Sequence, residues 1–173
     1  MPNMMINKQD GTVAFNNAHI PYGAWRNFAG GPSRFDPRNT KRYFEIFIPD
    51  DEAEKLSRAG WNVKWLEPKN ESEPKQAHLR IFVNYEVPAR FQPRIWMTRS
   101  NGDPIRLDPD DVCQLDSDDI IRAKIQIRPY DWEIPGTGRT GRKAMLKQMY
   151  VTIEEDDFGA EFYNHGEPMP FEE

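Results

Sequence analysis

Three segments of the chain alternate strictly between apolar and polar side chains, the pattern of a β-strand with one face in a core. A helix cannot satisfy this period of two, because its side chains repeat about every 3.6 residues. The chain must therefore be built around a β-sheet. The apolar faces are Leu79, Ile81, Val83 and Tyr85 in HLRIFVNY; Ile95 and Met97 in PRIWMTR; and Ile121, Ala123, Ile125 and Ile127 in IIRAKIQIR.

Further strands are predicted by residue type rather than by alternation. The run KRYFEIFI (41–48) is rich in β-branched and aromatic residues, and WNVKWL (61–66) has the same character. A last strand is predicted over 144–153, a short one over 12–15, and extended chain over 24–28. The count of about six strands without βαβ alternation predicts a small, mostly antiparallel barrel or sandwich.

One helix is predicted between Pro49 and Gly60. Asp51 is expected to cap it, with Glu54 completing a capping box. Ala53, Leu56 and Ala59 would share its apolar face, and Gly60 would end it as the C′ residue.

Charge is divided unevenly along the chain. All 23 Lys and Arg lie within residues 1–153 together with 20 of the 28 acids, so this part carries a net charge of +3. Residues 154–173 hold the other eight acids and no base. We therefore expect one folded domain over 1–153 and a disordered acidic tail over 154–173. The overall net charge of −5 conceals a basic body that suits a polyanion.

Several functional classes lack support in the sequence. No apolar run approaches the roughly 18 residues of a membrane span, and the N-terminus lacks the pattern of a signal peptide, so a cytoplasmic location is expected. Gly136, Gly138 and Gly141 fit G-x-G-x-x-G, but a predicted strand follows where the nucleotide fingerprint needs a helix. The aspartates of 108–119 lack the glycine of a calcium loop, and the histidines lack ligand spacing. No enzyme activity, cofactor or metal is expected.

The polar faces of the strands are more informative. If the apolar faces fill the core, the opposite faces expose cations together with aromatic rings. Single-stranded nucleic acid needs this mixture, because cations follow phosphates while flat rings stack on bases. The residues concerned are Arg80, Phe82, Arg94, Trp96, Arg122, Lys124 and Arg128, with Lys64 on the neighbouring strand.

The stretch GTGRTGRK (136–143) is interpreted as a flexible hairpin loop that can close over a bound strand. It contributes Arg139, Arg142 and Lys143, and Trp132 lies just before it. For each of these residues an ordinary soluble surface is the alternative explanation.

Taken together, these segments resemble bacteriophage-type single-stranded DNA-binding proteins built on an OB-fold. The residues that carry the resemblance are NFAG (27–30), RYFEIFIPDDEAEKL (42–56), GWNVKW (60–65) and IRPYDWEIPGTGRTGRKAMLKQMYV (127–151). The resemblance implies an OB-fold-like, five- or six-stranded antiparallel barrel with one or two short helices. It also implies a cationic groove made by the residues named above, followed by an acidic tail that recruits replication or recombination proteins. We further expect little sequence preference for the DNA, and we expect the acidic tail to compete with DNA for this groove.

The tail ends in MPFEE, so Pro170 and Phe171 are the expected partner-binding residues, although Phe171 lacks the terminal carboxylate of the similar bacterial tips. The leading hypothesis is non-enzymatic binding of single-stranded DNA during phage replication or recombination. Two alternatives remain: a β-rich protein-interaction or virion accessory module, and a nucleotide-using enzyme.

Overall fold

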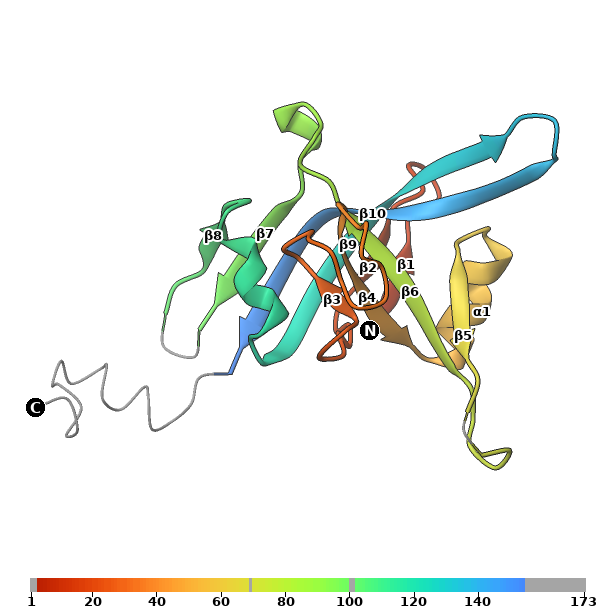
Figure 1. The fold of residues 1–173 in the computed structure, drawn as a ribbon, viewed down its shortest axis with the longest axis horizontal. Coiled ribbons are helices and arrows are strands. Elements are labelled where there is room, and N and C mark those ends of the chain that lie inside the picture. Colours follow the sequence, from red (N-terminus) through yellow and green to blue (C-terminus); the bar gives the residue numbers. More distant parts are fainter. Residues whose placement is uncertain (1–2, 69, 100–101, 155–173) are drawn as a thin grey trace, which may run out of the picture.

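The computed structural model describes residues 3–68, 70–99 and 102–154. Within them, ten strands form one sheet and a single α-helix lies beside it (Figure 1). The strands are β1 (Met4–Ile6), β2 (Val13–Phe15), β3 (Arg26–Asn27), β4 (Arg42–Ile48), β5 (Val63–Leu66), β6 (Gln76–Val83), β7 (Arg94–Thr98), β8 (Ile105–Leu107), β9 (Ile120–Ile134) and β10 (Arg139–Ile153). The helices are α1 (Asp50–Arg58) and the short 3-10 turns η1 (Ala89–Phe91) and η2 (Val112–Asp116).

Backbone pairing curls the centre of the sheet into a ring. Hydrogen-bonded neighbours run β2-β9-β10-β6-β4, and the segment after β2 joins the two ends. The Ala18 N–H donates to the Ala123 carbonyl of β9 (2.8 Å), and the Phe47 N–H of β4 donates to the His19 carbonyl (2.9 Å). If the segment 13–19, β4, β6, β9 and β10 are numbered 1 to 5 in chain order, their order around the ring is 1-4-5-3-2. This is the Greek-key barrel of the OB-fold, as the resemblance implied.

The mainly β class is confirmed, and the pairing is mixed rather than purely antiparallel. β6 and β7 lie one after the other along the same edge of β10, and both run parallel to it. Parallel neighbours need a long connection. Here the chain supplies one, because it passes through β8, η2 and β9 between β7 and β10.

The core follows the predicted alternation with one exception. The inward residues of β6, β7 and β9 are buried, but Ile121 is 59% exposed. The register between β9 and β10 shifts between Arg122 and Ile120, so Ile121 is the extra residue of a bulge. A bulge reverses the face on which the next side chain lies, and the placement of Ile121 in the core was wrong for that reason.

Helix α1 forms where predicted, but its N-terminus differs. Pro49 occupies the N-cap position and no side chain accepts a hydrogen bond there, so the predicted cap by Asp51 is wrong. Ala53 and Leu56 are buried, whereas Ala59 is exposed. Gly60 has a φ of 92°, the left-handed conformation of a C′ glycine, as predicted.

The expected glycine-rich loop is mostly strand. The chain turns at 135–138, where Gly136 and Gly138 have φ values of 80° and 69°, and β10 already begins at Arg139. The ends of β9 and β10 form a two-stranded arm that projects from the barrel (Figure 1). The cations of this region therefore lie on a paired ribbon and not on an irregular loop.

Residues 155–173 lie outside the described residues, and with them the predicted disordered tail, Pro170 and Phe171. The division of the chain at 153/154 stays a prediction. Among the described helices, none has the length and apolar character needed to cross a lipid bilayer.

Candidate nucleic-acid interface

A groove of about 660 Å³ opens at the base of the arm, and we call it the arm groove. One wall is the start of β10 with the facing part of β9; the other is the segment 84–93, which joins β6 to β7 and rises between β7 and the arm (Figure 1). The end of the loop before β4 closes one side. The lining residues are Thr40, Lys41, Arg42, Phe82, Val83, Asn84, Tyr85, Glu86, Val87, Pro88, Phe91, Arg128, Tyr130, Lys143 and Met145.

The charge of the arm groove is positive. Four of its lining residues are cations, and Glu86 is its one acid. The Lys143 ammonium lies 5.2 Å from the centre of the Phe82 ring, and the Arg128 guanidinium lies 5.9 Å from that of Phe91. The cations therefore sit beside aromatic rings, as a site for phosphates next to bases requires.

Aromatic rings are accessible in the same groove. Tyr130 is 56% exposed and Phe91 46% exposed, while Phe82 is half-buried. Isolated exposed aromatics are common on protein surfaces. Here they gather in one cationic hollow, which an ordinary soluble surface does not require.

Tyr85 contributes the inner wall of the arm groove. Burial raises the pKa of its phenol, and the nearby charges of Arg42 and Arg106 offset this only in part. The Arg42 guanidinium lies 5.3 Å from the centre of the Tyr85 ring. Because the pKa is raised from 10.0, Tyr85 stays a neutral phenol at physiological pH.

Side-chain hydrogen bonds hold the walls in place. The Gln92 amide donates to the carbonyls of Tyr85 (3.0 Å) and Val87 (3.2 Å), which fixes the turn of the segment 84–93. Arg42 donates to the carbonyls of Phe28 (3.1 Å) and Pro109 (2.7 Å). The groove is therefore pre-formed.

The structure divides the predicted site residues into separate groups. Phe82, Arg128 and Lys143 line the arm groove. A second group lies on the outer faces of β7 and β9, next to the groove. Its members are Arg94, Trp96, Arg122 and Lys124.

Two predicted cations, Arg80 and Lys64, do not line the arm groove, although Arg80 lies on the same outer face of β6 as Phe82. Arg80 is in contact with Glu45 (3.3 Å), and its guanidinium lies 4.0 Å from the centre of the Tyr43 ring. Its charge is therefore partly used within the fold. Lys64 is exposed on β5, opposite His78 of β6.

The remaining predicted residues belong to the arm. Arg142 donates to both carboxylate oxygens of Asp131 (2.7 and 3.3 Å) and to the Ala59 carbonyl (3.0 Å). Trp132 lies directly opposite Gly141 and packs over it. Arg139 is exposed at the start of β10. Arg142 and Trp132 thus have structural contacts that the sequence did not indicate.

Five of the cations and aromatic rings in the groove lining were not predicted as site residues: Lys41, Arg42, Tyr85, Phe91 and Tyr130. Lys41 and Phe91 lie in connections between strands, where no alternation marks the exposed side. Tyr130 lies on β9 two residues after Arg128, so extending the alternation of that strand would have found it.

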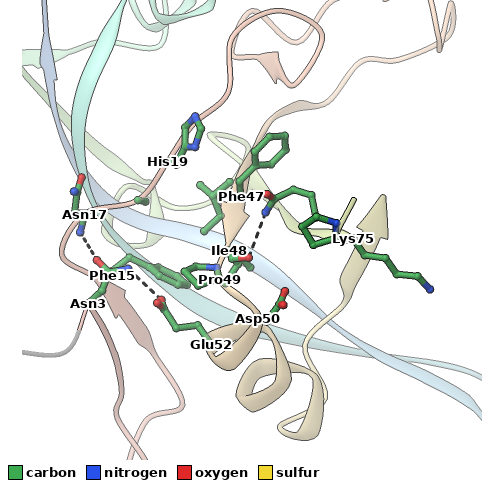
Figure 2. A pocket seen from close by; sticks show the side chains of 14 residues that line it. Asn3, Phe15, Asn17, His19, Phe47, Ile48, Pro49, Asp50, Glu52 and Lys75 are labelled. Atoms are coloured by element: carbon green, nitrogen blue, oxygen red, sulfur yellow. Dashed lines mark hydrogen bonds between the residues drawn. The ribbon is translucent and has the colours of Figure 1, made fainter. Parts of the chain in front are cut away.

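A second hollow of about 420 Å³ lies between the N-terminal segment, the end of β4 and the start of α1 (Figure 2). Asp50 and Glu52 are on its rim with Lys75, and the Asn3 amide donates to Glu52 (3.1 Å). Its charge does not favour a polyanion. In the described parts of the chain, His, Cys, Asp and Glu side chains do not gather in threes or more in a way that could hold a metal ion.

Comparison with known proteins places this geometry in context. Residues 8–167 match the family of phage ssDNA-binding domains. No curated protein matches the chain significantly.

Among solved structures, the chain is similar to the single-stranded DNA-binding protein of bacteriophage Enc34 in complex with ssDNA, at 11% identity and a TM-score of 0.49, covering 92% of this chain and 95% of that one. It is also similar to gp2.5, the single-stranded DNA-binding protein of bacteriophage T7, at 13% identity and a TM-score of 0.36, covering 91% and 98%.

Proposed function

The chain belongs to the family of phage single-stranded DNA-binding domains and binds single-stranded DNA, and we propose that the strand lies in the arm groove. The observation that carries this proposal is the gathering of four cations and four aromatic rings around one pre-formed hollow. The binding is non-enzymatic and has little sequence preference.

The position of the groove on the barrel supports the proposal. OB-folds bind oligonucleotides on the face of their second and third strands, between the loop joining strands one and two and the loop joining strands four and five. In this barrel β4 and β6 are the second and third strands. Lys41 ends the loop that joins strands one and two, and the arm is the connection between strands four and five. The arm groove occupies this place.

The mechanism follows from the chemistry of the lining. Arg128 and Lys143 hold phosphates, because their charges face the groove from β9 and β10. Bases stack on Tyr130, Phe91 and Phe82, where each stacked base contributes about 1–3 kcal/mol. Stacking tolerates any sequence because every base has a π-face, which agrees with little sequence preference.

Removal of the groove charges tests the proposal. We expect Arg128→Gln/Lys143→Gln to weaken the binding of oligo-dT and to reduce the salt dependence of log K by about 1.4, which is 0.7 for each lost phosphate contact. Fluorescence anisotropy of a labelled oligonucleotide between about 50 and 200 mM salt measures both quantities.

The matched control removes two exposed cations of α1 by Lys55→Gln/Arg58→Gln, which changes the net charge by the same amount away from the groove. This control should keep the wild-type salt slope. Equal effects of the two double variants would show that only net charge matters and would refute the arm groove as the site.

The family match and the charge of the body also support a role in phage DNA replication or recombination, in the cytoplasm of the host cell. The eight acids of 154–173 compete with DNA for the basic body. Pro170 and Phe171 are the proposed contact for replication or recombination proteins.

A further inference from the structure

A row of side chains crosses the outer face of four strands next to the arm groove. Lys124 of β9 is paired with Tyr150 of β10, Tyr150 with Trp96 of β7, and Trp96 with Arg106 of β8. Residues directly opposite in register point to the same face. The row therefore consists of two aromatic rings between two cations, and we call Lys124, Tyr150, Trp96 and Arg106 the outer ladder.

The two rings of the outer ladder lie against each other. The Trp96 and Tyr150 rings are nearly parallel, at 9°, with centres 6.1 Å apart. Tyr150 is 46% exposed. In a stacked pair each ring restrains the other and keeps its outer face free, and a base can stack on such a face at little cost in side-chain entropy.

Four cations lie around these rings. Arg106 and Lys124 are at the ends of the row. Arg94 lies two residues before Trp96 on β7, and Arg122 lies two residues before Lys124 on β9, so both are on the same face as the row. All four are exposed. None of the four forms an ion pair with any residue that the structure describes.

The outer ladder is continuous with the arm groove. Arg128, Gln126, Lys124 and Arg122 alternate on one face of β9, so each is about 6.5 Å from the next along the strand. Arg128 lines the groove, and Lys124 begins the ladder. In Figure 1, β7 and β8 lie at the opposite end of β9 and β10 from the arm, so a strand leaving the groove along β9 passes over them.

The charge distribution favours a polyanion over a second copy of this chain. A two-fold symmetric contact would place the four cations of one face close to those of the other, and like charges at a contact are destabilising. A nucleic-acid strand instead supplies phosphates for the cations and bases for the rings.

We propose that the outer ladder is a second contact for single-stranded DNA, which holds the part of the strand that leaves the arm groove. This inference rests on the proposed function, because it extends the same strand over a longer site. The two contacts together give a footprint near the upper part of the range of 4–16 nucleotides found for OB-folds.

The test compares two lengths of oligo-dT, of about 5 and about 15 nucleotides, where only the longer one reaches both contacts. We expect Arg122→Gln/Lys124→Gln to leave the binding of the short oligonucleotide unchanged and to weaken that of the long one about tenfold, with a salt slope reduced by about 1.4. Tyr150→Leu, which keeps apolar area and removes the π-face, should act in the same direction. Lys55→Gln/Arg58→Gln is the charge-matched control.

Each other outcome overturns the inference in a recognisable way. Equal weakening for both lengths would place these residues inside the first site. No weakening for either length would show that this face does not bind DNA. If light scattering then showed a dimer for the wild type and not for the variant, the face would be a protein interface. If the wild-type protein bound neither oligonucleotide, the proposed function itself would fail.

Discussion

Arg142 connects the arm to the body of the protein. It pairs with Asp131 across the arm, donates to the Ala59 carbonyl beyond the end of α1, and lies with its guanidinium 5.7 Å from the centre of the Trp61 ring. The Asn62 N–H also donates to the Arg142 carbonyl (3.2 Å). This cation therefore positions the arm and the groove beside it.

The pairing of Arg142 with Asp131 predicts a pH dependence. The hydrogen bond from Arg142 holds the pKa of Asp131 below its ordinary value of 3.8. A carboxyl whose pKa is lower in the folded state than in the unfolded state stabilises the fold at pH values above its unfolded pKa. This contribution to stability is lost as the pH falls through the folded-state pKa. Asp131→Asn should therefore lower the melting temperature slightly at pH 7, and the difference from wild type should decline as the pH falls below 3.8 and vanish below the folded-state pKa.

Glu133→Gln is the matched control for this pH dependence, because Glu133 is an exposed acid on the same strand. It should have no such effect. A difference between Asp131→Asn and wild type that persists in acid would show that the ion pair is not its cause.

Gly141 is a second residue on which the arm depends. A Cβ at this position would overlap the six-membered ring of Trp132, the residue directly opposite in the ribbon. We expect Gly141→Ala to displace the indole and to lower the free energy of unfolding by about 1–3 kcal/mol, the usual cost of overpacking. Urea denaturation followed by tryptophan fluorescence measures it.

Two comparisons sharpen this expectation. Gly31→Ala, at a glycine with no atom within 4 Å of the added methyl group, should be close to neutral. In the background of Trp132→Ala the cost of Gly141→Ala should disappear, because the ring that it meets is gone. An unchanged cost in that background would contradict the account of Trp132.

At the scale of elements, the segment 84–93 forms one wall of the arm groove. Gln92 holds it through the carbonyls of Tyr85 and Val87. We expect Gln92→Ala to weaken oligo-dT binding several-fold while changing the melting temperature little, because a less ordered wall must be ordered by the ligand. Anisotropy titration and thermal denaturation on the same sample separate the two effects.

Gln114→Ala provides the control for the wall. Gln114 is on η2 and donates one hydrogen bond to the Asp111 carbonyl (3.1 Å), so the change removes the same type of side-chain bond outside the groove. Its affinity for DNA should equal that of the wild type. An equal loss in both variants would mean that Gln92 acts through general stability.

Strands whose faces differ in polarity were predictable from the sequence. Leu79, Ile95 and Ile125 are buried as their alternation required, because one-sided burial fixes the face of every second residue. Ile121 could not be placed, since a bulge is set by the partner strand β10 and not by the sequence of β9.

The lining of the candidate groove was predictable in part for the same physical reason. Phe82, Arg128 and Lys143 lie on strands, and their sides follow from alternation. Phe91 and Lys41 come to the groove through connections whose path depends on tertiary packing. The ion pair of Arg142 with Asp131 could be predicted only from the strand register of the arm. The glycines of 136–143 had suggested a loop there instead.

At the scale of the whole molecule, charge is the main variable. Residues 1–153 have a net charge of +3 and residues 154–173 one of −8, on a single chain. Replacing the acids of 155–173 by their amides should tighten oligo-dT binding at low salt, because it removes a competing polyanion. The gain should decline as salt screens the attraction.

The full-length chain is kept in this variant, so that only charge changes. Anisotropy titrations at two salt concentrations measure the effect. Unchanged or weaker binding at low salt would rule out competition between the terminal acids and DNA.

The central claim is that single-stranded DNA lies in the arm groove. Photo-crosslinking of oligo-dT carrying 5-iodouracil, followed by mass spectrometry of the crosslinked peptides, tests it most directly. The account predicts crosslinks at Phe82, Phe91 and Tyr130, which line the groove from three different segments. Crosslinks confined to the hollow beside His19 and Asp50, with none in the arm groove, would contradict it.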